Sequence, residues 1–223
     1  MIIPTLQFET ELRRAGHRHI VGLDEVGRGC WAGPVVAGAV ILPVDDRAAC
    51  LVLRAAGARD SKLLSPAQRE TLVPLIKEVA LAVAVGGASA AEIDELGIAP
   101  ASRLAMRRAL AGLDLKGDAL LLDAFPLREI SLPQRAIVRG DQHSLSIAAA
   151  SIIAKVYRDR LMCAYESDFP GYDFARNKGY GTPAHRAALA AFGPTRLHRL
   201  TWAPLLARQL ALDLREATDE GKA

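Results

Sequence analysis

Cysteine is scarce in this sequence, and the spacing of its few copies excludes two classes of protein. Three cysteines occur among 223 residues, at positions 30, 50 and 163. An odd number of widely separated cysteines provides neither a disulfide framework nor the paired spacing of a zinc or redox motif. We therefore expect a protein of the reducing cytoplasm.

Long apolar runs and a strong net charge are also missing. The longest uncharged stretches, such as residues 79–91, are too short to cross a bilayer, and Glu9 and Glu11 stand where a signal peptide would be apolar. The net charge of +3 is compatible with a polyanionic partner without establishing one. With 51% hydrophobic residues the chain is not disordered, and its length suits one sizeable domain.

What the sequence does contain is a mixture of strand-like and helix-like patterns. Apolar, β-branched runs predict strands at residues 20–24, 35–42, 80–85, 120–123 and 136–138. Periodicity and capping residues predict a short helix or arm within residues 1–16 and helices at 66–77, 89–96, 100–113, 144–167, 183–192 and 202–216. Because the first three strands follow one another with short returns, we expect the sheet to start antiparallel.

A glycine-rich turn follows the first strand and its two acids. Gly27, Gly29 and Gly33 carry no Cβ, so the main chain there can take positive φ and lie close to a ligand. Arg28 offers a planar fork of donors that suits phosphate or sugar oxygens. A plain hairpin with a solvated acidic end is the alternative interpretation, and the acids found downstream weigh against it.

Acidic residues end two strands and follow a third. Side chains alternate along a strand, so Asp24 and Glu25 are expected on opposite faces, with only one at the centre of a pocket. Asp123 ends the strand at 120–123, and Asp141 follows the strand at 136–138. Strands that end on the same side of a sheet would bring Asp24, Asp123 and Asp141 together, and clustered carboxylates repel each other unless a cation neutralises them.

The chemistry of these ligands narrows the cation and the reaction. All of them are oxygens, which favours Mg²⁺ or Mn²⁺ over zinc. Paired divalent ions can stabilise both the attacking and the leaving oxygen of an in-line phosphoryl displacement. Phosphodiester hydrolysis is therefore the reaction that the pattern favours.

Several motifs in a fixed order carry a family resemblance. They are Asp24-Glu25-Val26-Gly27-Arg28-Gly29, Asp60-Ser61-Lys62, Leu122-Asp123, Gly140-Asp141 leading into residues 146–156, and Lys178-Gly179-Tyr180-Gly181-Thr182. Because these motifs occur in this order, the chain resembles bacterial ribonuclease HII, of the type 2 ribonuclease H family. The resemblance extends from Ile20 to Pro204. The resemblance implies an α/β ribonuclease H-like fold with a central five-stranded mixed sheet flanked by helices and a C-terminal helical extension. It also implies one catalytic domain over residues 1–223, in which about 168–223 form a loop and helical portion that binds substrate.

The same resemblance implies an activity and a catalytic set. The expected enzyme is an endonuclease that cuts RNA in RNA/DNA hybrids and cuts 5′ of single ribonucleotides in duplex DNA, leaving 3′-hydroxyl and 5′-phosphate ends. Such an enzyme would serve ribonucleotide excision repair and DNA replication. Its catalytic and metal-binding carboxylates would be Asp24, Glu25, Asp123 and Asp141, holding Mg²⁺ or Mn²⁺, as two ions in the substrate complex.

The resemblance further implies a set of substrate contacts. The glycine turn would read the 2′-hydroxyl of a ribonucleotide through its main chain, and Tyr180 would stack on the sugar of the adjoining deoxynucleotide. Lysines and one arginine elsewhere would contact the phosphate backbone, although each single lysine could equally be a solvated surface charge. The implied substrate-binding residues are Gly27, Arg28, Gly29, Ser61, Lys62, Lys155, Arg158, Lys178 and Tyr180.

Some positions depart from the family pattern, and two other functions compete with this one. Family members often have glycine after the strand-end aspartate, where this chain has Ala124 and Phe125. A ribonuclease HIII-type enzyme would carry an added N-terminal domain, whereas only about twenty residues precede the first strand here, and its glycine turn would commonly hold lysine where Arg28 stands. A hybrid-binding module without turnover is the third reading, and retention of all four acids argues against it.

The expected partners are nucleic acids. RNA/DNA hybrids and ribonucleotide-containing duplex DNA would bind a monomer, with no membrane contact. The segment from Gln209 to Leu214 resembles the short peptide by which bacterial replication proteins hold the sliding clamp. A plain amphipathic C-terminal helix is the alternative interpretation of that segment.

Overall fold

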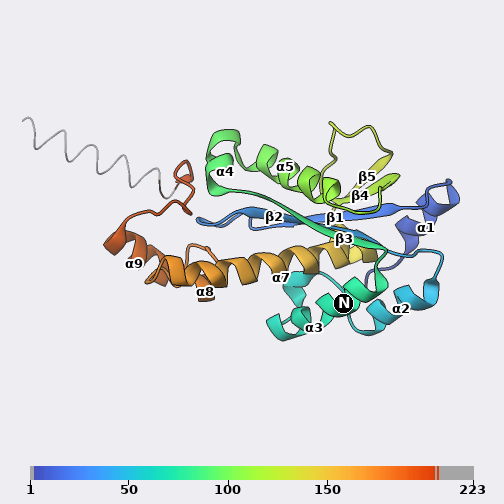
Figure 1. The fold of residues 1–223 in the computed structure, drawn as a ribbon, viewed down its shortest axis with the longest axis horizontal. Coiled ribbons are helices and arrows are strands. Elements are labelled where there is room, and N and C mark those ends of the chain that lie inside the picture. Colours follow the sequence, from blue (N-terminus) through green and yellow to red (C-terminus); the bar gives the residue numbers. More distant parts are fainter. Residues whose placement is uncertain (1–2, 204, 206–223) are drawn as a thin grey trace, which may run out of the picture.

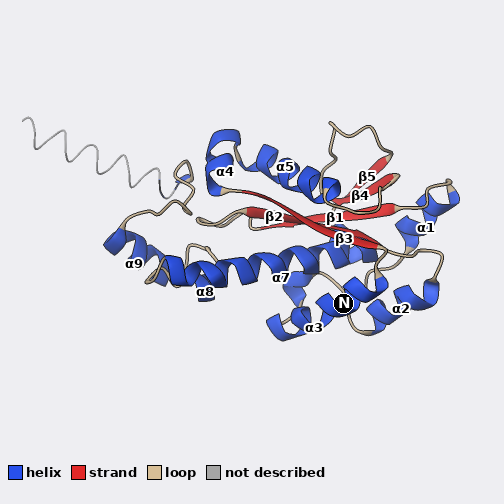
Figure 2. Cartoon of the chain, viewed as in Figure 1, coloured by secondary structure: helices blue, strands red, loops and turns tan. Residues whose placement is uncertain are grey.

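A mixed five-stranded sheet runs through the middle of the molecule, and helices cover both of its faces (Figure 1, Figure 2). The structure is a computed structural model that describes residues 3–203 and residue 205. The strand order is β3-β2-β1-β4-β5, in which β1 pairs antiparallel with β2 and parallel with β4. The strands are β1 Ile20–Val26, β2 Val35–Ile41, β3 Ala82–Ala88, β4 Ala119–Asp123 and β5 Gln134–Ile137. The predicted mixed sheet and its antiparallel start are thus confirmed.

The helices form one layer on each face of the sheet. Helices α4 and α5 lie over one face, and the long helix α7 crosses the other, with α3 packed on its outer side (Figure 1). The helix bounds are α1 Gln7–Arg14, α2 Arg47–Ala55, α3 Pro66–Val79, α4 Ala90–Leu96, α5 Ile98–Ala111, α6 Gly140–His143, α7 Leu145–Asp168, α8 Phe174–Asn177 and α9 Pro183–Phe192, with a 3₁₀ turn η1 at Ser61–Leu63. Within the described residues, no helix is long and apolar enough to cross a bilayer.

Local capping explains why several helices start where the sequence predicts. The Ser65 hydroxyl accepts from the Gln68 amide and the Gln68 side chain accepts from the Ser65 amide, which forms a capping box before Pro66. Ser144 caps the long helix α7 in the same way, by accepting from the amide of Ile147. The short helices α6 and α8 were not predicted, because neither is long enough to show a period. The predicted helix at 202–216 lies mostly outside the described residues. The segment from Gln209 to Leu214 lies entirely outside them.

Glycines in the strands let both helix layers approach the sheet at main-chain distance. A Cβ on Gly22 would lie 2.2 Å from the carbonyl carbon of Ser146, and one on Gly38 would lie 2.3 Å from the carbonyl oxygen of Ala150. Both contacts belong to α7, whose residues 145–154 are all buried. The close packing fixes the height of α7 above β1 and β2, and therefore fixes the side chains that α7 presents at the ends of these strands.

Strand β3 extends further than the sequence predicts, because it continues through Gly86 and Gly87. These residues pair with Ala37 and Val36 of β2, and this pairing outweighs the low strand propensity of glycine. Gly86 faces α5, where a Cβ would lie 2.2 Å from the amide nitrogen of Ala109. A Cβ on Gly87 would meet its nearest atom at 3.5 Å, an ordinary contact.

This difference between adjacent glycines makes a prediction about stability. Gly86→Ala should lower the free energy of unfolding by about 1–3 kcal/mol, because the methyl group overlaps the α5 main chain. Gly87→Ala, the matched control, should be neutral or slightly stabilising, since it only reduces the freedom of the unfolded chain. Urea denaturation of both variants measures the two effects, and equal losses would contradict the packing argument.

Candidate active site

Three of the predicted acids come together at one end of the sheet. Strand β1 carries Asp24 opposite Gly38 of β2, and the parallel neighbour β4 ends at Asp123, one position beyond the paired residues Leu23 and Leu122. Asp141 arrives in α6, close after β5. Asp24 and Asp141 are buried, at 5% and 3% exposure. The shared end of parallel strands therefore collects these carboxylates, as the sequence predicts.

The carboxylates lie close enough to repel one another. Burial raises the pKa of Asp24 well above its usual value, and the charges of Glu25, Asp123 and Asp141 raise it further. Burial and the charges of Asp60 and Asp123 raise the pKa of Asp141 to about 7. This crowding of negative charge is the electrostatic signature of a site that requires a cation.

Glu25 has one satisfied and one unsatisfied oxygen. Its Oε1 accepts a hydrogen bond of 3.1 Å from Nη1 of Arg28, which lowers the pKa of this carboxyl, while burial raises the pKa by more. Its Oε2 is buried and has no partner among the described residues. An orphaned carboxylate oxygen beside other acids is a suitable ligand for a hard divalent cation.

The carboxylate oxygens of this site are suitable ligands for a divalent cation, but the side chains are not arranged in the geometry of a metal-binding site. Among residues 3–203 and 205, no group of three His, Cys, Asp or Glu side chains is arranged to hold a metal ion. One oxygen of Asp24 accepts the amide of Glu25 at 2.7 Å, and one oxygen of Asp123 accepts the amide of Gly140 at 2.7 Å. These two carboxylates are therefore held by main-chain donors at the edge of the site.

A fifth carboxylate joins the site, and the sequence analysis gave it no role. Asp60 is buried and shares a hydrogen bond with Asp141. Its Oδ1 accepts the amide of Lys62 at 2.9 Å and its Oδ2 accepts from the Gln142 side chain at 3.3 Å. Its position in the motif Asp60-Ser61-Lys62 was a signal in the sequence, but only Ser61 and Lys62 of this motif were predicted to contact substrate. Asp60 ties the loop before α3 to the carboxylates.

The loop residues predicted to contact phosphate lie beside these acids. Burial lowers the pKa of Lys62, but the charges of Asp24, Asp141, Asp60 and Asp123 outweigh it, so that the pKa is raised overall. Ser61 is buried, with its hydroxyl 2.8 Å from that of Ser151, and Ser151 in turn is hydrogen-bonded to Asp24. Lys62 thus places a positive charge beside the cluster, in addition to the guanidinium of Arg28 that pairs with Glu25.

The glycine turn presents its main chain to open space. Gly27 and Gly33 have positive φ values of 94° and 83°, as the turn chemistry predicts, whereas Gly29 does not take a positive φ. A Cβ on Gly29 would meet no atom within 4 Å. Among the described residues, no acceptor receives the amides of Arg28 and Gly29. Successive free amides beside open space can bind an oxygen of a ligand.

Arg28 and the departures from the family pattern lie together. The guanidinium of Arg28 stands over the ring of Phe125, 5.2 Å from its centre, in addition to its contact with Glu25. Ala124 has a φ of 61°, in the left-handed region that glycine adopts without strain. The alanine therefore holds a backbone shape for which glycine is the usual residue.

Tyr180 is placed where a ligand could reach its ring. The side chain is 42% exposed on the loop after α8. Its hydroxyl group is hydrogen-bonded to Cys30, and burial of that end of the residue, with Cys30 beside it, raises its pKa. A core position for this tyrosine is thereby excluded, and the residue joins its loop to the glycine turn.

The remaining cations are engaged with the protein itself. Lys155 forms an ion pair of 2.8 Å with Asp159, and the Nζ atom of Lys178 donates to Cys163 at 3.0 Å and to the carbonyl of Ala175. Their contact with phosphate stays a prediction.

Arg158 requires a correction, because it is fully buried. Its guanidinium donates to the carbonyls of Pro34 (2.9 Å), Lys178 (2.9 Å) and Ala32 (3.0 Å). The predicted phosphate contact is therefore wrong for this conformation. The carbonyls at the end of the glycine turn need donors, and Arg158 supplies them.

Two buried histidines next to this loop were not found by sequence analysis. His185 Nδ1 lies 2.9 Å from the carbonyl of Tyr180, so this nitrogen carries a proton. The amide of Thr195 donates to His198 Nδ1 at 2.8 Å, so that nitrogen carries none. The two Nε2 atoms lie 3.0 Å apart, and the proton between them therefore belongs to His198. Protonating either ring would place two donors face to face.

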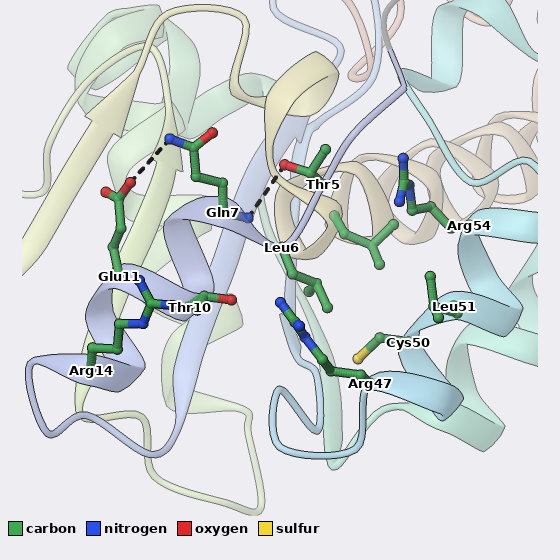
Figure 3. A pocket seen from close by; sticks show the side chains of 11 residues that line it. Thr5, Leu6, Gln7, Thr10, Glu11, Arg14, Arg47, Cys50, Leu51 and Arg54 are labelled. Carbon is green, nitrogen blue, oxygen red and sulfur yellow. Dashed lines mark hydrogen bonds between the residues drawn. The ribbon is translucent and has the colours of Figure 1, made fainter.

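A cavity of about 630 Å³ lies elsewhere, between α1 and α2 (Figure 3). Arg14, Arg47 and Arg54 line it together with Leu6 and Cys50. None of the predicted site residues lines this cavity. The candidate active site is instead the open region beside the carboxylates and the glycine turn.

Comparison with known proteins gives consistent family matches. Residues 21–205 match the family model described as Ribonuclease HII. A ribonuclease HII of Chloroflexus aurantiacus is 53% identical over 95% of this chain and 99% of its own length. One of Roseiflexus castenholzii is 52% identical over 98% of this chain and 96% of its own length.

Solved structures agree with these matches. The crystal structure of ribonuclease H2 from Pyrococcus horikoshii has a TM-score of 0.71 and 26% identity, covering 88% of this chain and 98% of that one. The ribonuclease HII of Archaeoglobus fulgidus, solved in complex with PCNA, has a TM-score of 0.69 and 29% identity, covering 82% and 95%. Bst-RNase HIII in complex with Mn²⁺ has a TM-score of 0.62 at 21% identity, covering 88% and 70%, and shows the fold alone.

The histidine pair predicts how stability depends on pH. Burial and the neighbouring His185 lower the pKa of His198 from 6.5 to about 4. Above pH 6.5 the His198 ring is neutral in both the folded and the unfolded state, and the histidine pair contributes its full stability. Between pH 6.5 and about 4 only the unfolded state binds the proton, so up to about 3 kcal/mol of unfolding free energy is lost as pH falls.

Urea unfolding of the wild type and of His198→Gln between pH 7.5 and 4.5 measures this effect. The wild type should lose more stability than the variant as the pH falls, because glutamine does not titrate. Parallel pH profiles for the two proteins would contradict the assignment.

Proposed function

The chain belongs to the ribonuclease HII family, and from that premise we propose that it cuts RNA in RNA/DNA hybrids and cuts 5′ of single ribonucleotides in duplex DNA. The cut would leave 3′-hydroxyl and 5′-phosphate ends. One observation carries this proposal: free main-chain amides of the glycine turn lie next to a cluster of buried carboxylates. The amides would read the sugar while the carboxylates act on the adjoining phosphodiester.

The proposed catalytic and metal-binding residues are Asp24, Glu25, Asp123 and Asp141. Enzymes of this family depend on metal, and the oxygen donors favour Mg²⁺ or Mn²⁺. When bound, the cations would neutralise the acids and stabilise charge on the attacking and leaving oxygens. The chain contributes the Lys62 ammonium beside the acids, and Asp60 lies next to Asp141.

Discrimination between RNA and DNA would rest on the main chain. The amides of Arg28 and Gly29 can donate to a 2′-oxygen, which deoxyribose lacks. The absence of a Cβ at Gly29 leaves room for a sugar to approach. The exposed ring of Tyr180 would stack on the adjoining deoxynucleotide, and Ser61, Lys62, Lys155 and Lys178 would contact the phosphate backbone. We assign this loop to the substrate-binding portion, from about residue 168 onward, of a single catalytic domain.

The cellular role and partners follow from the same activity. We propose a monomer that acts in ribonucleotide excision repair and DNA replication. A contact with the sliding clamp through the segment from Gln209 to Leu214 rests on its sequence pattern and on the complex that the Archaeoglobus fulgidus relative forms with PCNA. The two competing functions are weaker, since the relatives that share about half of their residues with this chain are ribonucleases HII and all four acids are present.

Removing the charge of one carboxylate should stop the reaction. Asp24→Asn and Asp123→Asn should each lower the cleavage rate at least about a thousandfold, or about 4 kcal/mol of barrier, because they remove charge that the cations need. Duplex affinity should change little, since phosphate contacts remain. Cleavage of a labelled duplex with one ribonucleotide, with binding measured in parallel, tests both points.

Asp45→Asn is the matched control for these variants. Asp45 pairs with Arg13 on the surface, away from the candidate site, so its variant should keep full activity. Retained cleavage by Asp24→Asn would contradict the catalytic assignment. A wild-type protein that binds the duplex without Mg²⁺-dependent cleavage would instead favour the binding module.

The exposed ring of Tyr180 predicts a substrate-dependent effect. Tyr180→Ala should lower cleavage at single ribonucleotides by about tenfold or more, a value typical of lost stacking, and lower cleavage of long hybrids less. Tyr180→Phe keeps the ring and loses only the bond to Cys30, so it should act nearly as the wild type. Equal losses by Tyr180→Ala on both substrates would contradict the stacking role.

A further inference from the structure

Two arginines of this protein are fully buried and form no ion pair among residues 3–203 and 205. They are Arg158 and Arg199, each 0% exposed. A buried charge is costly unless hydrogen bonds satisfy it, so each guanidinium must have a structural reason for its position. Arg158 holds the carbonyls of Ala32, Pro34 and Lys178, as described above.

Arg199 holds the glycine turn itself. Its Nη1 donates to the carbonyl of Arg28 at 2.7 Å, and its Nη2 donates to the carbonyls of Gly27 at 2.6 Å and Gly33 at 2.9 Å. Its Nε donates to Gly33 at 3.2 Å. Burial lowers the pKa of Arg199 to about 10, so the guanidinium stays charged at neutral pH.

The direction of these bonds sets the direction of the free amides. In a trans peptide unit the carbonyl of one residue and the amide of the next point in opposite directions. A guanidinium that draws the carbonyl of Gly27 inward therefore turns the amide of Arg28 outward. The same contact at the carbonyl of Arg28 turns the amide of Gly29 outward. Neither of these two amides has an acceptor among the described residues.

The main chain around Arg199 supports the same arrangement. The amide of Gly33 donates to the carbonyl of Leu197 at 2.8 Å, and the amide of Arg199 donates to the carbonyl of Trp31 at 2.9 Å. This short antiparallel pairing, centred on the bridge between Ala32 and His198, carries the Arg199 side chain under the turn. The turn is thus held at its C-terminal end by this pairing and from beneath by the Arg199 side chain.

We propose that Arg199 is a positioning residue for ribonucleotide recognition, which holds the carbonyls of Gly27 and Arg28 so that the following two amides face the substrate. The inference rests on the proposed function, because it takes a 2′-hydroxyl as the ligand of these amides. Arg199 itself touches no substrate. Its effect is on the geometry of the two donors.

Replacing Arg199 by lysine tests the role of its planar guanidinium group. Arg199→Lys keeps the positive charge but cannot reach three carbonyls in one plane, so the amides lose their fixed direction. Two constants are measured with Mg²⁺: KM for a duplex with one ribonucleotide, and Ki of the all-deoxy duplex as a competitive inhibitor. We expect KM to rise about tenfold, as for one lost hydrogen bond, while Ki changes little.

The controls separate this role from a loss of folding. A smaller folded fraction lowers kcat but leaves KM and Ki unchanged. Met106→Ala, on the buried face of α5, is a matched destabilised variant that should keep the wild-type ratio of Ki to KM. An unchanged ratio in Arg199→Lys would overturn the inference. A wild-type ratio near one would instead overturn the proposed function.

A measurement on the wild-type protein needs no variant to fold. Because three carbonyls lock the guanidinium of Arg199, its four Nη protons should give separate, slowly exchanging resonances in nuclear magnetic resonance spectra. A single averaged signal would show a mobile Arg199 side chain. It would overturn the proposed positioning role, whatever result the variants give.

Discussion

The repulsion between carboxylates at the common end of β1 and β4 is the constraint around which the rest of the structure is organised. Parallel pairing places Asp24 and Asp123 in adjacent positions, and burial of Asp24 limits the screening of its charge by water. The chain offsets the repulsion only in part, through the ammonium of Lys62, the guanidinium of Arg28 and main-chain amides. The carboxylate oxygens that these groups leave unpaired, such as Oε2 of Glu25, fit a divalent cation of the kind that metal-assisted hydrolysis uses.

Much of this architecture could be predicted because it depends on local signals. Strand periodicity, the caps at Ser65 and Ser144, and the rule that parallel strands share an end were sufficient to bring three acids together. The positive φ of Gly27 and Gly33 followed from turn chemistry. These features are written in residues that lie near one another in the sequence or in a sheet register that follows from them.

The features that could not be predicted all depend on contacts across the chain. Arginine is usually a surface residue, so nothing in the sequence marks Arg158 and Arg199 as buried donors to carbonyls. The pairing of His185 with His198 and the contact of Asp60 with Asp141 likewise require the tertiary structure. In each case the partner is a main-chain atom or a side chain whose position is fixed by packing, and neither leaves a pattern in composition or spacing.

The distance along the chain between Arg199 and the glycine turn has a consequence for protein synthesis. Arg199 is 171 positions from Arg28 and 172 positions from Gly27. The glycine turn therefore leaves the ribosome long before Arg199 is translated. The sheet end and its acids can assemble on the nascent polypeptide while the amides of Arg28 and Gly29 are still unaligned. The proposed direction of these amides would then be set only after Arg199 has been translated.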